Sequence, residues 1–478
     1  MENHAAIVWF RNDLRLADNP ALAAACDSGL PVICLYIHDE QAQGIRPAGA
    51  ASRWRLNGAL QALAWEISRR GGELHFLRGA AEEVLPRLVE KIAQAKIFWN
   101  RRYGGGEIAQ DTRLKAHLRA SGHEVASFNG ALLAEPREFA PKSGGSYKVF
   151  TPFWRALREN LSVPPPLPAP DKIPSGAWPS EAPAPVALAD LDLAPKKPDW
   201  ARKFPDPAPG EFLAQRRLHD FLRQKLGGYG AMRDRLDAEA TSGLSAHLHF
   251  GEISSRRIFR EVESHGGGDK FLSELGWREF SYHLLYAFPD LAWRNFNGRF
   301  DAFPYRRDDA ALEAWKRGAT GYPVVDAGMR QLWASGWMHN RARMVCASFL
   351  TKHLLIDWRE GEAWFWDTLA DADVANNAAS WQWVAGCGAD AAPYFRIFNP
   401  VLQGEKFDPD GLYVRRFCPE LAGLPNKFIH RPWTAPAAIH AEAGVKLGET
   451  YPLPLVDHDF ARRRALAAYE DISGTTSV

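Results

Sequence analysis

The first 135 residues alternate short apolar runs with amphipathic stretches, and this pattern constrains the fold more than any other feature of the chain. Strand–helix alternation with short connections is typical of a parallel sheet with helices on both faces, so we expect a doubly wound α/β domain. The expected strands are residues 7–10, 31–37, 73–77, 97–100 and 123–128, and the expected helices lie near 18–28, 52–70, 80–94 and 107–121. No Gly-x-Gly-x-x-Gly fingerprint follows the first strand, which excludes the usual dinucleotide site.

The rest of the chain divides at a proline-rich stretch. Prolines crowd residues 162–209, and such a segment cannot form regular hydrogen-bond ladders. From residue 211 strand signals nearly vanish, and helical patterns continue to about residue 470. We therefore predict an α/β domain over 1–135, an interdomain linker over 136–210 and an all-α domain over 211–478.

Composition excludes several classes of protein. No run approaches eighteen consecutive apolar residues, and the first residues lack the pattern of a secretory signal. The five cysteines form no Cys-x-x-Cys pair, so we expect reduced thiols, no zinc site and a cytoplasmic protein. The net charge is only +1, so any contact with nucleic acid must come from a local basic face.

Ordered motifs run through nearly the whole chain. They are residues 10–15 (FRNDLR), Tyr229, 241–254 (TSGLSAHLHFGEIS), 277–280 (WREF), 320–330 (TGYPVVDAGMR), 337–344 (WMHNRARM), 371–377 (DADVANN), 381–383 (WQW) and 394–400 (YFRIFNP). Together they resemble the photolyase/cryptochrome family. The resemblance implies an N-terminal antenna domain and a helical domain that holds FAD in a U shape. It also implies a carbon–carbon lyase, a deoxyribodipyrimidine photo-lyase, in which light-excited FADH⁻ donates an electron to a pyrimidine dimer flipped out of the DNA.

The resemblance implies a set of FAD-binding residues, and their chemistry suits the cofactor. Hydroxyl groups at a helix start can donate to the FAD pyrophosphate, although the same segment also fits a helix N-cap. A neutral amide at Asn377 can accept from the flavin N5–H, whereas an isolated Asn in this place is usually a cap. The implied set is Tyr229, Thr241, Ser242, Gly243, Leu244, Ser245, Trp277, Arg278, Asn340, Asp371, Asp373 and Asn377.

A second implied set binds UV-damaged DNA, the expected partner of a monomeric, nucleoid-associated protein. A flipped dimer needs aromatic platforms and a few polar contacts. The implied residues are Glu274, Trp277, Asn340, Arg341, Met344 and Trp383, with Arg341, Arg343, Arg396 and Lys406 as cations on the rim. If these cations bind DNA phosphates, the affinity for DNA should fall steeply as the salt concentration rises. The alternative is that they form a solvated arginine surface without a binding role.

The remaining implied residues carry electrons or light. Trp381 and Trp358 match the inner members of the family's electron relay, and Tyr305 stands where many relatives carry Trp. The relay ends at Tyr305 or branches through Trp364, Trp366 or Trp293. Glu107 falls where folate-type members bind 5,10-methenyltetrahydrofolate, which is the expected antenna. The alternatives are 8-hydroxy-5-deazaflavin, or no antenna with Glu107 simply starting a helix.

Three activities compete within the family. Residues 381–390 resemble class III dimer photolyases, which we favour. A (6-4) photolyase carries paired histidines where this chain has Asn340 and Met344, so the required proton donor is missing. Cryptochromes often replace the residue at Asn377 by Asp and carry long tails, and a single-strand-preferring relative also fits the pocket. Gly243 and Ala246 depart from the family's usual Arg and Pro.

Overall fold

The chain forms two compact units in a computed structural model that describes residues 4–142, 144–205, 208–391 and 395–474. The first unit comprises residues 1–202, 206–227 and 242–289, and the second comprises 203–205, 228–241 and 290–478. Residues 211–227 and 242–289, which we expected in the helical domain, thus belong to the first compact unit. The predicted domain boundaries at 135 and 210 stay a prediction.

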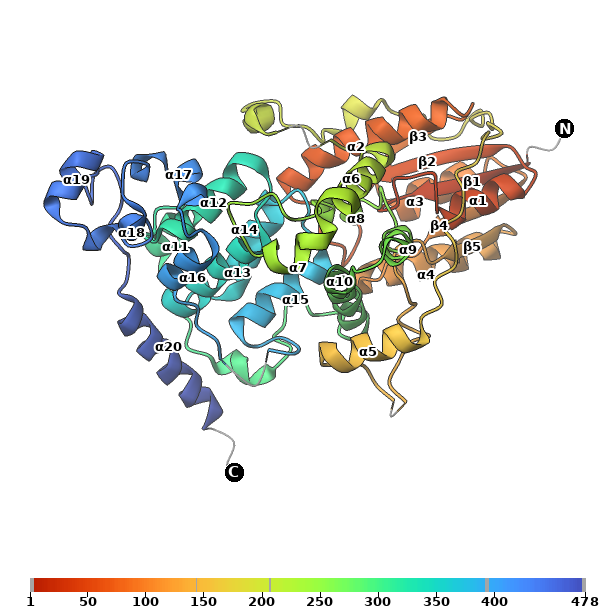
Figure 1. The fold of residues 1–478 in the computed structure, drawn as a ribbon. Helices are drawn as coiled ribbons and strands as arrows, with labels where there is room; N and C mark the ends of the chain where they lie inside the picture. The colour runs from red at the N-terminus through yellow and green to blue at the C-terminus, as the bar shows by residue number, and fades with distance from the viewer. Residues whose placement is uncertain (1–3, 143, 206–207, 392–394, 475–478) are drawn as a thin grey trace. The chain divides into compact units, whose positions relative to one another are not determined.

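The first unit contains the predicted parallel sheet (Figure 1, red to orange). Its order is β3-β2-β1-β4-β5, and every pair is parallel. The strands are β1 (His4–Phe10), β2 (Val32–His38), β3 (Leu74–Arg78), β4 (Gln94–Asn100) and β5 (Glu124–Phe128). The order reverses direction at β1, so a switch point lies between the carboxyl ends of β1 and β4.

Helices cover both faces of the sheet because its strands are apolar on both faces. In β1, Ala6, Val8 and Phe10 belong to a buried cluster that includes residues of α1 (Pro20–Asp27) and α2 (Ala50–Ser68). The alternate residues Ala5, Ile7 and Trp9 join a cluster with α3 (Ala81–Val89) and α4 (Gly105–Ala120). This alternation is the period-2 pattern of a strand buried on both sides. The predicted α/β fold is therefore confirmed.

The proline-rich stretch lies along the first unit. Its described residues include two 3₁₀ turns, η1 (Leu188–Leu191) and η2 (Trp200–Lys203), but no α-helix and no strand of the sheet. The Ile173 N–H donates to the Arg70 carbonyl (2.8 Å), and the Val186 N–H donates to the Phe76 carbonyl (2.9 Å). The second bond protects β3, which is an edge strand of the sheet.

Helices form nearly all of the regular structure after β5. In the first unit they are α5 (Phe150–Asn160), α6 (Glu211–Gln224), α8 (Ser245–His249), α9 (Ser255–His265) and α10 (Asp269–Ala287). In the second unit they are α7 (Tyr229–Met232), α11 (Asp309–Lys316), α12 (Pro323–Ser335), α13 (Asn340–Ser348), α14 (Trp358–Thr368), α15 (Val374–Ala385), α16 (Pro400–Phe407), α17 (Leu412–Phe417), α18 (Asn426–Ile429), α19 (Ala437–Ala443) and α20 (His458–Ser473). A π-helical turn, η5 (Phe349–His353), extends α13, and short 3₁₀ turns, η3 (Leu226–Gly228), η4 (Gly298–Ala302), η6 (Pro419–Leu421) and η7 (Pro432–Thr434), connect other helices.

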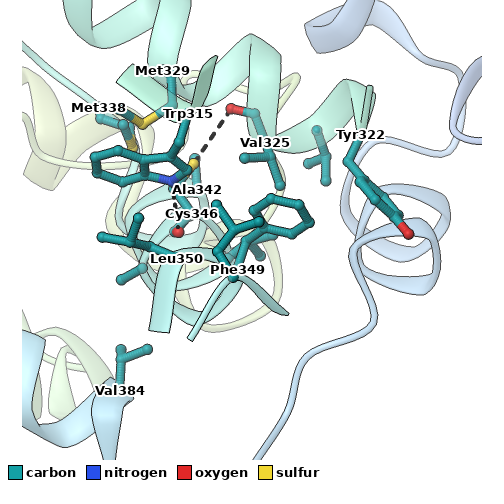
Figure 2. Close-up of a cluster of buried hydrophobic side chains, with 14 of the residues drawn as sticks. Trp315, Tyr322, Val325, Met329, Met338, Ala342, Cys346, Phe349, Leu350 and Val384 are labelled. Carbon is teal, nitrogen blue, oxygen red and sulfur yellow. Dashed lines mark hydrogen bonds between the residues drawn. The ribbon is translucent and has the colours of Figure 1, made fainter. Parts of the chain in front are cut away.

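The core of the second unit is built around Trp315. Its side chain is fully buried, and its indole N–H donates to the Cys346 carbonyl (3.0 Å). The Cys346 thiol in turn donates to the Val325 carbonyl (3.5 Å), and Met329 and Met338 lie beside the indole (Figure 2). These contacts join α11, α12 and α13 into one packed core. Among the described residues, no helix is long and apolar enough to cross a membrane.

Candidate functional site

Three of the predicted FAD residues lie at the start of α15: Asp371 and Asp373 precede the helix, and Asn377 lies in its first turn. Asp373 caps α15, because its carboxylate accepts from the backbone N–H and the side-chain amide of Asn376, both at 2.8 Å. The amide nitrogen of Asn377 donates to the side chain (2.8 Å) and the backbone carbonyl (3.1 Å) of Glu362. Glu362 therefore binds the nitrogen end of the Asn377 side-chain amide. The amide oxygen is the end that can accept a hydrogen bond from a ligand.

Four more predicted residues of the second unit lie in α13: Asn340, Arg341, Arg343 and Met344. The Asn340 amide lies 3.9 Å from the Met344 sulfur, so the two residues share one helix face. Arg341 is ion-paired with Asp234 at 2.8 Å, and Arg343 is ion-paired with Asp371 at the same distance. Two of the four predicted rim cations are thus partly neutralised by carboxylates before any phosphate binds.

Two buried polar atoms test whether this region suits a polar ligand. Arg341 Nε and Gln403 Oε1 have no hydrogen-bond partner among the described residues. The Arg341 guanidinium lies 4.4 Å from the ring centroid of Phe407, which follows Gln403 by one turn of α16. A donor and an acceptor left unpaired on neighbouring elements cost free energy unless a ligand or water satisfies them. The residues present are therefore compatible with a polar ligand, as FAD would be.

The predicted phosphate-binding segment begins with Thr241 and continues into the first unit with residues 242–245. Gly243 has φ +63°, and a Cβ there would stand 2.5 Å from a guanidinium nitrogen of Arg217. Arg217, on α6, thus places a cation where the sequence lacks the family's usual Arg. Sequence reasoning missed Arg217, because no local pattern connects it with a segment 26 residues later.

A buried ionic cluster anchors the same segment. Glu252 accepts from Arg55 (2.7 Å) and from the Gly210 N–H (2.7 Å), and it lies 2.5 Å from His247 Nδ1. The side chains of Arg55 and Glu252 are 2% and 0% exposed. A buried pair of this kind must be complete, because removing one partner leaves an uncompensated charge. The cluster therefore fixes α8 and the turn that follows it against α2.

Trp277, predicted to contact both FAD and the lesion, lies half-buried on α10. Phe150 stacks on its indole with ring centroids 3.9 Å apart and planes 9° apart. Glu274 is ion-paired with Lys270 at 3.3 Å. The Arg278 guanidinium donates to the Ala131 carbonyl (3.1 Å), so it holds a loop of the first unit.

The predicted electron relay has two buried tryptophans and a half-buried tyrosine. Trp381 is 2% exposed, and Trp358 is fully buried with its indole N–H donating to Asn295 (2.8 Å). Burial raises the pKa of Tyr305, so loss of its phenolic proton is disfavoured in the folded protein. Gly361, one turn after Trp358 on α14, lies directly against the indole of Trp381.

The branch residues differ in exposure. Trp364 stacks at 5.8 Å on Trp333, which is 62% exposed, and Trp293 is 53% exposed. Trp366 is half-buried against the core of the second unit. An oxidised ring at Trp333 or Trp293 would be in contact with solvent, and the outer end of the relay stays a prediction.

Glu107, the predicted antenna ligand, lies in the first turn of α4. Its carboxylate accepts from the Gly104 N–H (3.0 Å) and lies 3.6 Å from an Arg102 nitrogen. In this arrangement the carboxylate caps its own helix, which is the simpler of the two roles that the sequence suggested. The antenna assignment stays a prediction. Tyr394, in the last sequence motif, lies outside the described residues.

Comparisons with known proteins match both halves of the chain. Residues 6–171 match the family described as DNA photolyase, and residues 271–471 match the FAD binding domain of DNA photolyase. The chain is 51% identical to a deoxyribodipyrimidine photo-lyase of Agrobacterium fabrum, covering 98% of both chains. It is 39% identical to cryptochrome-1 of Arabidopsis thaliana, covering 96% of this chain and 69% of that protein.

Solved structures give the same result. A bacterial class III photolyase from Agrobacterium tumefaciens superposes with a TM-score of 0.94 at 50% identity, covering 99% of both chains. A cryptochrome from Synechocystis superposes with a TM-score of 0.89 at 31% identity, covering 98% of this chain and 99% of that one.

The fold and these matches define a light-dependent flavoprotein that has a parallel-sheet domain and a helical FAD-binding domain. The chain belongs to the photolyase/cryptochrome family, and its identity is higher to the photolyases named above than to the cryptochromes. The predicted family, fold class, enzyme class and FAD cofactor are confirmed at this level. The individual site residues stay predictions.

Proposed function

We propose that this chain is a deoxyribodipyrimidine photo-lyase that repairs cyclobutane pyrimidine dimers in DNA under blue or near-UV light. The main support is 51% identity to a photo-lyase along 98% of both chains. The site adds a physical argument. Glu362 lies 2.8 Å from the Asn377 amide, so an Asp at position 377, as many cryptochromes have, would place two carboxylates against each other.

FAD supplies the light-driven electron transfer when it is bound, and the protein binds and orients it. Asn377, held by Glu362, offers an amide oxygen to the N5–H of the reduced flavin. Arg217 and the hydroxyl groups of residues 241–245 hold the pyrophosphate. The pair Arg343–Asp371 fixes a carboxylate that can accept from the flavin or its ribose. Trp381, Trp358 and Tyr305 return the flavin to its reduced state.

We propose that the residues which the family resemblance implies for DNA binding receive the lesion. Trp277 and Trp383 provide aromatic platforms for the dimer, and Glu274 accepts from a base edge. Asn340 and Met344, on one face of α13, provide a polar and a soft apolar contact. Arg396 and Lys406 bind phosphates on the rim. DNA is then the partner of a monomeric protein that works at the nucleoid.

We also propose that the first unit holds an antenna, with 5,10-methenyltetrahydrofolate ahead of 8-hydroxy-5-deazaflavin. The support is the place of Glu107, after the carboxyl end of β4, where α/β proteins usually bind ligands. To bind a pterin, the Glu107 carboxylate would have to give up the hydrogen bond that it accepts from the Gly104 N–H. The absorption spectrum of the purified protein, before and after the flavin is removed, decides between a folate, a deazaflavin and no antenna.

The deciding experiment is repair itself. The purified, pre-reduced protein is irradiated with an oligonucleotide that contains one thymine dimer, and restored thymines are counted by chromatography. We expect light-dependent repair that stops in the dark. A protein that photoreduces its flavin but restores no thymine in duplex or single-stranded DNA would instead be a cryptochrome, which the 39% identity to the plant protein makes the second candidate.

A further inference from the structure

One buried cation is not used by the proposed mechanism. Lys352 lies in η5, the π-helical turn that extends α13, and only 1% of the residue is exposed. A buried ammonium is costly unless its surroundings compensate the charge. π-helical turns interrupt the register of an α-helix and often occur at functional sites, because they turn side chains in new directions.

Two groups that compensate Lys352, among the residues that the structure describes, belong to one irregular segment. Its ammonium donates to the Arg396 carbonyl (3.1 Å) and lies 3.5 Å from the ring centroid of Phe395. A cation over an aromatic face is most favourable where water is excluded. Residues 395–399 form neither helix nor strand before α16 begins at Pro400. Lys352 therefore ties this segment to the end of α13.

The segment that Lys352 holds carries an exposed arginine. The Arg396 guanidinium lies 5.9 Å from the ring centroid of Trp383, while its backbone carbonyl faces Lys352. A cavity of about 30 Å³, large enough for a water molecule, is lined by Lys352, Trp383, Asp390 and Arg396 among others. The lysine, the arginine and the tryptophan thus surround one small polar space.

We propose that Lys352 is a positioning residue for damaged DNA: it holds the backbone of Phe395 and Arg396 so that the Arg396 guanidinium stays beside the Trp383 ring. Lys352 does not itself touch DNA. The inference rests on the proposed function, because it takes Trp383 and Arg396 as the residues that meet the lesion and its flanking phosphate.

The charge of Lys352 makes this arrangement sensitive to pH. Burial lowers the pKa of Lys352 to about 7, and Cys387 opposes this only in part. Burial also raises the pKa of the Cys387 thiol to about 12 and lowers the pKa of His353, on the same turn, to about 3. Asp390 and Arg396 are the other ionisable residues that line the cavity within the described part of the chain. Above neutral pH the lysine loses its proton and with it the attraction to the Phe395 ring.

The test measures affinity for a dimer-containing oligonucleotide by fluorescence anisotropy at pH 6.5, 7.5 and 8.5 and constant ionic strength. The variant Lys352→Met keeps the length of the side chain and removes the charge. We expect it to bind about tenfold more weakly than wild type at pH 6.5, because loss of the cation–π contact lowers the fraction of protein whose segment is held in the binding conformation. The difference should shrink towards pH 8.5. Lys446→Met, which removes an exposed charge paired with Glu449, is the matched control and should bind as wild type does.

Three results separate the explanations. Equal affinity of Lys352→Met and wild type at pH 6.5 overturns the inference, and so does a constant difference at every pH. If Lys352 acts through Arg396, then adding Lys352→Met to Arg396→Met causes no further loss, and an additive loss contradicts the inference. Flavin absorbance reports whether each variant is folded. A wild-type protein that does not prefer dimer DNA over undamaged DNA would refute the proposed function instead.

Discussion

The contact between Gly361 and Trp381 gives the sharpest test of the electron relay. A Cβ at position 361 would stand 2.1 Å from Cη2 and 2.6 Å from Cζ3 of Trp381, and 2.6 Å from a methyl group of Leu350. Carbon atoms in contact are about 3.5–4.0 Å apart, so in Gly361→Ala the indole must move by roughly 1.5 Å. Trp381 and Leu350 are 2% and 0% exposed, so neither can turn outward into solvent without displacing other packed side chains.

The cost follows from two opposing effects. Forcing an extra methyl group into a packed core costs about 1–3 kcal/mol, and we expect the upper end because both neighbours are buried. Alanine gains about 1 kcal/mol over glycine inside a helix. The net loss of stability in Gly361→Ala is therefore about 2 kcal/mol, and the displaced indole should slow photoreduction of the oxidised flavin.

The assay combines denaturant unfolding with photoreduction under blue light. Gly474→Ala, whose added Cβ would meet only ordinary contacts, is the control and should change neither quantity. In Trp381→Phe the smaller ring has no atom at Cη2, so adding Gly361→Ala should cost at least about 1 kcal/mol less than it does in wild type. A Gly361→Ala protein with wild-type stability and photoreduction would refute the reasoning.

Three further predictions concern Trp277, Trp381 and Glu279. Trp277→Ala should weaken binding of dimer DNA in a titration yet retain FAD, although Phe150 loses its stacking partner; loss of the flavin would show that Trp277 is misplaced in the proposed site. Trp381→Phe should slow photoreduction of oxidised flavin but leave repair by pre-reduced protein largely intact, and equal loss of both would contradict a separate relay. Burial raises the pKa of Glu279 in the folded protein to about 7. The stability that the protonated carboxyl contributes is therefore full below the pKa of Glu279 in the unfolded chain, and it is lost as the pH rises through 7. Relative to wild type, Glu279→Gln should therefore gain stability between pH 5 and 7, by up to about 3 kcal/mol in unfolding experiments, and a constant difference would show that the carboxyl does not titrate there.

The sequence by itself determined the architecture of each half. Short apolar runs with amphipathic stretches between them predicted the parallel sheet, and the strands begin and end within three residues of the expected positions. The motifs at residues 241–254, 337–344 and 371–377 predicted the family, and the last two lie within the matched FAD binding domain. These features are local or strongly patterned, so they can be read without knowing which distant residues meet.

Only the tertiary structure decided how the polar side chains are paired. Glu362 orients Asn377, Asp234 partly neutralises Arg341, and Arg217 lies against Gly243. Each pair joins residues that are 15 to 107 positions apart, and no periodicity in the chain marks them as neighbours. The charge state of Lys352 likewise depends on being enclosed by residues that follow it by more than forty positions. Burial and long-range pairing set the energies of charged groups, and these depend on the packed fold.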